Sequence, residues 1–568
     1  MKSVASLLSI FALGFGLLGC AAKEEVPFTN TTAASAPFGV VGNDYSATLA
    51  TTCSTVLLPW TVSSGVLPIG LSFNGATGDV TGRPIVAGNF IVVFAGKDST
   101  GKTETCAVLF LVHPRTDRVS VDTNGNSVAG AVNTEPSISW TDGRFIAFTS
   151  TGSTLIPVVV GQQIYVHDRQ TGRLSLVSMD SFGNAGTGGA SSAASVSADG
   201  RFVAFVSTAT NLVPGVSGQQ IYLHDTQPLP NGRTTLVSQD GSGNPANAGL
   251  FGTSNTAPRV SANGRFIAFV STATNLVPGV SGQQIYLHDT QTSVTLLNGQ
   301  TTLVSQDGSG TPATPGSLNT SPTISADGRF IAFVSTATNL VSLPSGVSVS
   351  GQQIYLHDTQ LLLNGRTTLV SKDGSGFPAS TNGTSTGLSN VSNTAPTISA
   401  DGRFIAFVSN AINLDPSVPA GSGQQIYRHD TQQADPNKRT TLVSKDNSIP
   451  PAPANAGLFG TFNTSPTISE DGRFIAFVST ATNLVSLPSG VSVSGQQIYL
   501  HDTQLLLNGQ TTLVSKDESG TPATPGSSNL APVVATNGAF VAFVSSATNL
   551  VTSPPPAAAV DVYVRALP

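Results

Sequence analysis

The stretch PTISADGRFIAFVSTATNL at residues 322–340 decides the fold, because close copies of it recur along most of the chain. After a loop it is followed by GQQIYLHD at residues 351–358, and after a second loop by TTLVSKD at residues 367–373. These segments are short and rich in β-branched and aromatic residues, which favours strands. A period of this length indicates one repeated supersecondary unit, and this unit supplies four strands.

The repeats can be counted. The GRFIAF-like segment occurs seven times, with its glycine at residues 143, 200, 264, 328, 402, 472 and 538. The IY segment also occurs seven times, but the LVS segment that follows it occurs six times. A strand in RTDRVSVDTNGN at residues 115–126, before the first full unit, makes up the difference. The pattern predicts a seven-bladed β-propeller over residues 114–568, closed by this N-terminal strand so that no sheet edge stays open.

Local patterns support the strand boundaries. Asp-Gly or Asn-Gly precedes every copy of the RF or AF pair, and these dipeptides predict a hairpin with a type I′ turn. The RFIAFVS segment that follows is apolar on both faces, as expected for a strand between two neighbouring sheets.

Composition favours an all-β repeat protein and excludes a nucleic-acid-binding one. The 568 residues include 58 Gly and 35 Pro, and only 10% are charged. The formal charge of -6 is spread thinly, with no basic block that could neutralise a row of phosphates. We therefore expect no nucleic-acid partner.

The N-terminus reads MKSVASLLSIFALGFGLLGC, an early lysine followed by an apolar run that is short for a membrane span. Its Leu17-Leu18-Gly19-Cys20 ending resembles the lipobox of bacterial lipoproteins. The resemblance implies a signal peptide over residues 1–19 and a lipid, palmitate among its acyl chains, on Cys20 as the only membrane anchor. Ala21 after the cysteine implies sorting to the outer membrane. The alternative is an ordinary signal peptide with an unrelated cysteine.

Residues 20–37 lack periodicity and are predicted to be a flexible tether. Residues 38–113 alternate apolar and polar residues between Gly and Pro turns, which predicts a β-sandwich with Trp60 in its core. Through Trp60, Leu67-Pro68, Gly70-Leu71, Thr77-Gly78, Gly82, Pro84, Gly88 and Asp98, this segment resembles the Ig-like domains of bacterial surface proteins. That resemblance implies a spacer or adhesive module without catalytic residues.

Cys53 and Cys106 are the two cysteines left in the mature chain. In an exported protein an isolated pair predicts a disulfide, which would contribute about 4 kcal/mol through the loop it closes. A reactive thiol or a metal-binding pair is the alternative.

The repeat unit resembles the TolB-like propeller repeat, in which S-x-D-G-[KR]-x-[IL]-A-[FY] precedes I-Y-x-x-D. The matching residues of one copy are Ser325, Asp327, Gly328, Arg329, Ile331, Ala332, Phe333, Ile354, Tyr355 and Asp358. The chain differs from TolB itself in its lipid anchor, its Ig-like first domain and its additional blade. The known partner of TolB is therefore not carried over.

A His-Asp pair recurs at His167, His224, His288, His357, His429 and His501. Adjacent residues on a strand point to opposite faces, so the pair does not form a catalytic dyad. Sheets ~10 Å apart also cannot share one zinc ion, which binds His at about 2.1 Å. We expect each histidine to bond to backbone or a hydroxyl, and each aspartate to form a turn with the next residues.

No cofactor or metal is expected. Loops such as Asp240-Gly-Ser-Gly and Asp122-Thr-Asn-Gly-Asn faintly resemble calcium loops, but they lack the regular second carboxylate, and Asx-turns explain the same residues. We find no G-x-S-x-G motif and no phosphate loop.

Positions that break the repeat are the better candidates for specificity. They are Asn410, Asp415 and Arg428 in the fifth blade, together with Lys438-Arg439 there and the Leu155–Val160 loop of the first, although drift explains each equally simply. The longest loops, between the second and third strands and between the fourth strand and the next unit, are predicted to share one face. Functional contacts concentrate on such loops.

The sequence thus predicts a non-enzymatic, lipid-anchored envelope protein that binds a protein or glycan through this long-loop face. The alternatives are an extracellular propeller hydrolase or lyase acting on a polymer, and a calcium-stabilised adhesin. The hydrolase requires one cluster of unlike carboxylates or histidines at the mouth of the axial channel.

Overall fold

The computed structural model describes residues 34–36, 39–40, 44–49, 57–86, 88–97, 100–113, 115–157, 159–227, 232–247, 254–291, 299–360, 365–381, 391–455, 462–488, 491–504, 509–535, 538–551, 555–556 and 559–567. The predicted signal peptide, Cys20 and Cys53 lie outside these residues, so lipidation and the Cys53–Cys106 disulfide stay predictions. Within the described ranges, no helix is long and apolar enough to cross a membrane.

Two sheets form the N-terminal part of the described chain. The first is ordered β1-β8-β7-β4 with β2 also paired to β8, and the second is ordered β3-β6-β5. Their strands are β1 (Ala34–Ser35), β2 (Gly39–Val40), β3 (Tyr45–Thr48), β4 (Leu57–Ser64), β5 (Leu71–Asn74), β6 (Asp79–Gly82), β7 (Gly88–Lys97) and β8 (Thr103–His113). Both sheets contribute to one apolar core, in which Trp60 is 2% exposed, so the prediction that this tryptophan is a core residue is confirmed.

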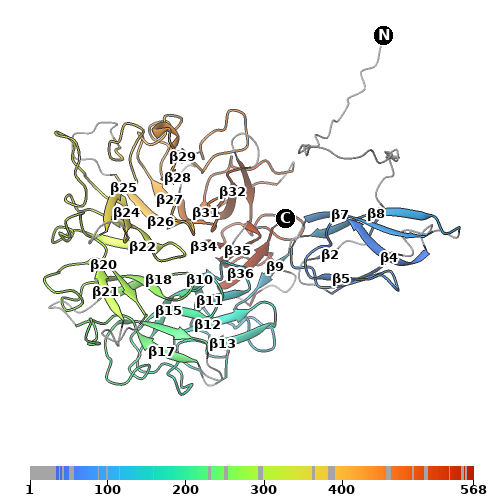
Figure 1. Cartoon of the computed structure of the whole chain (residues 1–568), viewed down its shortest axis with the longest axis horizontal. Coiled ribbons are helices and arrows are strands. Elements are labelled where there is room, and N and C mark those ends of the chain that lie inside the picture. Colours follow the sequence, from blue (N-terminus) through green and yellow to red (C-terminus); the bar gives the residue numbers. More distant parts are fainter. Residues whose placement is uncertain are drawn as a thin grey trace, which may run out of the picture.

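Four-stranded antiparallel sheets make up the rest of the described chain, consistent with a β-propeller, and Figure 1 shows them arranged around a common centre. We number these sheets 1 to 7 by their first strands. Sheets 1 to 3 contain β10 (Asn133–Ile138), β11 (Phe145–Ser150), β12 (Gln163–Asp168) and β13 (Arg173–Leu176); β14 (Ser191–Val196), β15 (Phe202–Ser207), β16 (Gln220–Asp225) and β17 (Arg233–Leu236); β18 (Asn255–Val260), β19 (Phe266–Ser271), β20 (Gln284–Asp289) and β21 (Gln300–Leu303).

Sheets 4 to 7 follow the same order. They contain β22 (Asn319–Ile324), β23 (Phe330–Ser335), β24 (Gln353–Asp358) and β25 (Arg366–Leu369); β26 (Asn393–Ile398), β27 (Phe404–Ser409), β28 (Gln425–Asp430) and β29 (Thr440–Leu442); β30 (Asn463–Ile468), β31 (Phe474–Ser479), β32 (Gln497–Asp502) and β33 (Gln510–Leu513); β34 (Asn529–Val534), β35 (Phe540–Ser545), β36 (Asp561–Ala566) and β9 (Thr116–Arg118). A short 3-10 helix, η2 (Pro436–Lys438), precedes β29.

The last sheet combines the two ends of the repeat region. β9 pairs antiparallel with β36, with Arg118 opposite Tyr563 and Thr116 opposite Arg565. Each first strand contacts the first strand of the next sheet, and β34 contacts β10. The seven first strands therefore surround a common space.

The apolar cores lie between neighbouring sheets. In the core between sheets 4 and 5, Val334 and Ile354 meet Phe407 and Tyr427. The second strands are buried along nearly their whole length, as in the pattern of β23, because a sheet covers each of their faces. This confirms the prediction made from the RFIAFVS segments.

The turns before the second strands differ from the predicted type I′. In the turn from Ser197 to Gly200, Gly200 N–H donates to the Ser197 carbonyl, and the glycine has a φ of 75°. Asp199 does not have a positive φ, whereas a type I′ turn requires one at both central residues. A Cβ on Gly200 would come 2.1 Å from the ring of Phe145, so the glycine also lets this turn pack against sheet 1.

Candidate functional site

The repeated histidines are structural. Nδ1 of His357 lies 2.9 Å from Oγ1 of Thr367 on the next strand, and the same pairing occurs at His224, His288, His429 and His501. Burial lowers the pKa of His357 to about 4, so the ring is neutral at neutral pH. The predicted histidine–hydroxyl bond is confirmed.

The same hydroxyl joins two sheets. Thr367 Oγ1 donates its single hydrogen to the Gln306 carbonyl of sheet 3, so it can only accept from His357. The proton of this neutral imidazole is therefore on Nδ1. In sheet 1 the threonine is replaced by Leu174, and the buried Nδ1 of His167 has no hydrogen-bond partner among the described residues.

The repeated aspartates are structural as well. Asp358 accepts the backbone N–H of Gln360, which is the predicted turn. Its two carboxylate oxygens also accept Nε and Nη2 of Arg329 at 2.8 and 2.7 Å. This ion pair was not predicted from the sequence, although the Arg in each GRF segment and the Asp in each HD segment could have indicated it. Equivalent pairs occur at Arg144–Asp168, Arg201–Asp225, Arg265–Asp289, Arg403–Asp430 and Arg473–Asp502.

The Asp-Gly-Ser-Gly loops form Asx-turns. One carboxylate oxygen of Asp240 accepts the backbone N–H groups of Ser242 and Asn244, at 2.8 and 2.9 Å. Among the described residues no three His, Cys, Asp or Glu side chains gather in a way that could hold a metal ion.

The three predicted binding residues are bonded into different parts of sheet 5. Asn410 accepts the Ser392 backbone N–H, the role that a threonine has in most other sheets. Asp415 accepts the Leu442 N–H at 3.1 Å. Arg428 donates to the Gly472 carbonyl of sheet 6 and stacks 4.3 Å from the ring centre of Phe404 in its own sheet. Their predicted role in binding stays a prediction.

The two kinds of long loop lie side by side. Asn339, in the loop between β23 and β24, donates to the Pro312 carbonyl and accepts the Thr314 N–H. Both partners belong to the loop between β21 and β22. Equivalent asparagine bridges occur at Asn211, Asn275, Asn413, Asn483 and Asn549.

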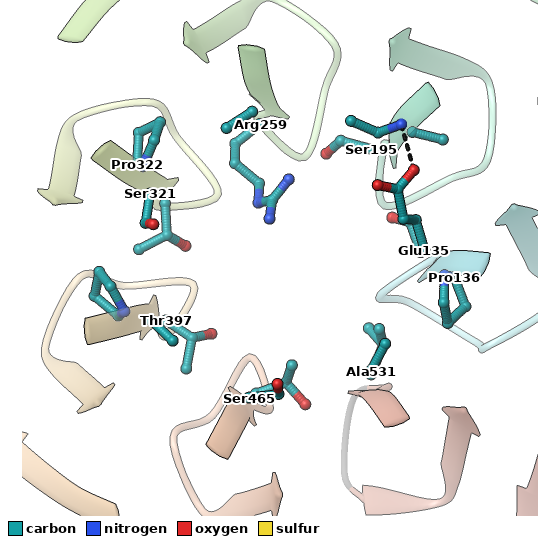
Figure 2. Close-up of a pocket in the computed structure, with 18 of the residues that line it drawn as sticks. Glu135, Pro136, Ser195, Arg259, Ser321, Pro322, Thr397, Ser465 and Ala531 are labelled. Carbon is teal, nitrogen blue, oxygen red and sulfur yellow. Dashed lines mark hydrogen bonds between the residues drawn. The ribbon is translucent and has the colours of Figure 1, made fainter. Parts of the chain in front are cut away.

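The first strands enclose a cavity of about 700 Å³. Most of its lining repeats from sheet to sheet and consists of Ala, Ser, Thr and Pro side chains. Figure 2 shows these residues projecting inward from the surrounding strands. These lining residues were not predicted from the sequence, in which the longer loops were the expected binding surface.

Each first strand is bulged where it meets the cavity. The pairing of β26 with β27 shifts register between Thr394 and Thr397, and Ala395 within the shift has a φ of 50°. The equivalent residues Glu135, Ala193, Ala257, Ser321, Ser465 and Ala531 have φ values from 48° to 55°. A non-glycine residue in this region is strained, and such strain clusters at functional sites.

Three charged residues interrupt the repeated lining, namely Glu135 and Arg259 within first strands and Glu470 beyond the end of β30. Glu135 occupies the bulge of sheet 1, and Arg259 replaces the hydroxyl residue that follows the bulge in sheets such as 4 and 5. Figure 2 shows Arg259 extending into the cavity. Arg259 is exposed to the cavity, but the surrounding strands exclude part of its hydration and so lower the pKa of its guanidinium, which the negative charge of Glu135 partly offsets. Aligning NTEPSI and NTAPRV with the NTSPTI of other units would have revealed Glu135 and Arg259.

The hydrolase alternative requires a cluster of unlike carboxylates or histidines. The described lining of the cavity contains Glu135, within β10, and Glu470, beyond the end of β30, but no histidine. The two carboxylates lie on sheets 1 and 6 and at different heights along their strands.

The comparisons with known proteins give only distant similarities. No family model matches the sequence, and no curated protein matches it. Among solved structures, the chain is similar to a prolyl endopeptidase, with 13% identity and a TM-score of 0.39 over 88% of this chain and 56% of that one. It is also similar to the β-propeller domain of the Trilobed protease from Pyrococcus furiosus, with 12% identity and a TM-score of 0.38 over 74% and 92%. The third is a TolB from Agrobacterium tumefaciens described as putative, with 16% identity and a TM-score of 0.31 over 70% and 95%. The chain thus spans 56% of the endopeptidase, and the solved structures it resembles are TolB-like and other β-propeller proteins.

Proposed function

We propose that this chain is a non-enzymatic, lipid-anchored protein of the bacterial cell envelope that binds a protein or glycan partner. In this proposal the four-stranded sheets form a closed seven-bladed propeller, held on an Ig-like spacer. Cys20 carries the lipid that anchors the chain in the outer membrane, and Cys53 and Cys106 form a disulfide.

One observation carries the binding role. The polar residues that recur in most units are bonded to one another within each sheet, as in the His357–Thr367 and Arg329–Asp358 pairs. A repeated group that is buried and bonded in this way is not available to bind substrate. The polar surface that remains includes the long loops, which the bridges of Asn339 and its equivalents hold side by side.

The chain offers a matched test of this face. The loop SLPSGVSVSG occurs at residues 342–351 and 486–495, and sheet 2 has the shorter loop PGVSG at residues 214–218. The short loop keeps the buried valine, since Val216 and Val349 are equally buried. Exchanging both long loops for the short one should leave the folding unchanged and remove the partner captured by mild crosslinking on intact membranes.

The control is an exchange in a different connection. Replacing Leu361-Leu362-Leu363 with the Pro-Leu-Pro of residues 228–230 alters the chain between β24 and β25. This variant should capture the same partner as the unmodified chain. An unchanged partner set after the long-loop exchange would mean that this face does not bind it.

A further inference from the structure

The cavity inside the first strands has one cation in its described lining. At the second position after each bulge residue the sheets carry Ser137, Ser195, Arg259, Thr323, Thr397, Thr467 and Val533. Six of these side chains are small and uncharged, so the arginine of sheet 3 stands alone among them. The repeat itself therefore shows that the fold does not require an arginine at this position.

The guanidinium of Arg259 uses only part of its hydrogen-bond donors within the described chain. Its Nη1 donates to the Pro258 carbonyl at 3.0 Å, and within the described chain it forms no ion pair. An arginine carries five N–H donors and stays charged at neutral pH. Figure 2 shows the guanidinium lying inside the cavity.

Glu135 provides the complementary group. Its Oε2 accepts the Thr149 hydroxyl at 2.9 Å and the Ala193 N–H at 2.6 Å, and Figure 2 shows the second bond as a dashed line. Its Oε1 has no hydrogen bond to the described residues. The carboxylate is thus held in place by sheets 1 and 2 while one oxygen stays open to the cavity.

We propose that this cavity binds a small carboxylic acid that also carries an amino or hydroxyl group. The carboxylate pairs with Arg259, whose planar fork matches it in a bidentate arrangement. The amino or hydroxyl group donates to Glu135 Oε1. This site is separate from the long-loop face, so it goes beyond the binding role proposed above.

Charge and size narrow the ligand class. One cation with two carboxylates, Glu135 and Glu470, in the same cavity favours a monoanion and disfavours a phosphate dianion, which both carboxylates would repel. A volume of about 700 Å³ lies within the range of small-molecule sites.

Calorimetric titration of the full chain tests the proposal with defined probes. Alanine supplies the amino acid, glucuronate the hydroxy acid, acetate a carboxylate alone and glucose hydroxyls alone, and inorganic phosphate is the competing anion. We expect alanine or glucuronate to bind more tightly than acetate, glucose and phosphate. Binding of neither alanine nor glucuronate, or tighter binding of phosphate, overturns the proposal.

The repeat supplies variants that should fold. Arg259→Thr introduces the residue of sheets 4 to 6 and should weaken the binding of the preferred acid by about tenfold or more, the effect of losing a charge-assisted hydrogen bond. Glu135→Ser introduces the residue of Ser321 and should weaken the preferred acid but not acetate.

Thr397→Val is the control, because Val533 holds this position in sheet 7. It should leave the affinity within about twofold, well below the tenfold effect of a lost charged bond. Melting temperatures without ligand show whether each variant is folded. Equal binding by Arg259→Thr and the unmodified chain, or an equal loss in Thr397→Val, would refute the assignment. The long-loop exchanges described above should leave this affinity unchanged, so the two proposals fail separately.

Discussion

The buried histidines make stability depend on pH. Each of His224, His288, His357 and His429 has a pKa lowered to about 4 by burial, against about 6.5 in an unfolded chain. The unfolded state therefore binds more protons between these values. The contribution of these neutral rings to the free energy of unfolding is fully present above about pH 6.5 and is lost as the pH falls toward 4.

Replacing one of them should reduce this dependence. We expect His224→Asn to lower the slope of unfolding free energy against pH, between pH 5 and 6, by about 1.4 kcal/mol per pH unit. Denaturant titrations at several pH values measure it. Thr234→Val, which removes the same hydrogen bond but no titrating group, should change the free energy and keep the slope. An unchanged slope in His224→Asn would show that the ring does not titrate as described.

For single residues, the sequence predicted the kind of hydrogen bond that a side chain makes better than it predicted which residue is the partner. Alternation along a strand was enough to separate His357 from Asp358 and to expect a hydroxyl partner. The Arg329–Asp358 pair was missed because it joins two strands, and only their register brings the residues together. Arg259 and Glu135 were missed because the importance of a lining position depends on a cavity that strand patterns do not reveal.

The first strands carry a bulge that limits which residues they tolerate. No β-branched residue occurs at the positive-φ position in any of the seven first strands. We expect Ala395→Val to destabilise the protein by about 1–3 kcal/mol, because the branched side chain clashes with the backbone in this conformation. Thermal and denaturant unfolding measure the effect.

Two substitutions at the same position provide the controls. Ala395→Ser introduces the residue found at Ser321 and Ser465, and it should change stability by less than about 0.5 kcal/mol. Ala395→Gly should be tolerated, since glycine adopts a positive φ without strain. A valine variant as stable as the serine variant would contradict the argument. The sequence did not predict these bulges, because the residue before a proline usually adopts an extended conformation.

Sheet 7 contains a buried ion pair that the other sheets lack. Arg118 Nε lies 3.1 Å from Asp561 Oδ2, and the two side chains are 8% and 0% exposed. Register places a glutamine at the aspartate position in other sheets, such as Gln220, and a leucine at the arginine position, such as Leu236. The two strands that bring the ends of the repeat region together are therefore joined by a pair of their own.

Breaking this pair should be costly, and restoring the common pattern should not be. Asp561→Gln leaves the Arg118 charge buried, so we expect a loss of about 3–5 kcal/mol in unfolding free energy. The double variant Arg118→Leu with Asp561→Gln should recover most of that loss, because it recreates the pattern of the other sheets. Denaturant unfolding of the single and double variants measures both effects. A double variant less stable than Asp561→Gln alone would contradict this account.

The whole-molecule architecture was the most predictable part. Counting strand segments indicated repeated four-stranded sheets and a strand from residues 115–126 beside the last one, and β9 pairs with β36 in this way. The repeats made the strand pattern easy to recognise, since each unit shows the same strand and turn signals. The same repetition concealed the site, because the informative residues are single departures from it.

The identity of residues 333–365 and 477–509 has a consequence for the size of the ring. Deletion of residues 333–476 would leave the sequence around the new junction unchanged. Each remaining sheet would still pack against a sheet of the same type. No contact between neighbouring sheets would differ after the loss of the two sheets. The number of units is then set by the angle between neighbouring sheets. A ring of fewer sheets needs a larger angle at each interface, and it would bring the bulges of the first strands too close together at the centre. The central cavity that holds Arg259 would therefore also determine how many sheets the ring contains.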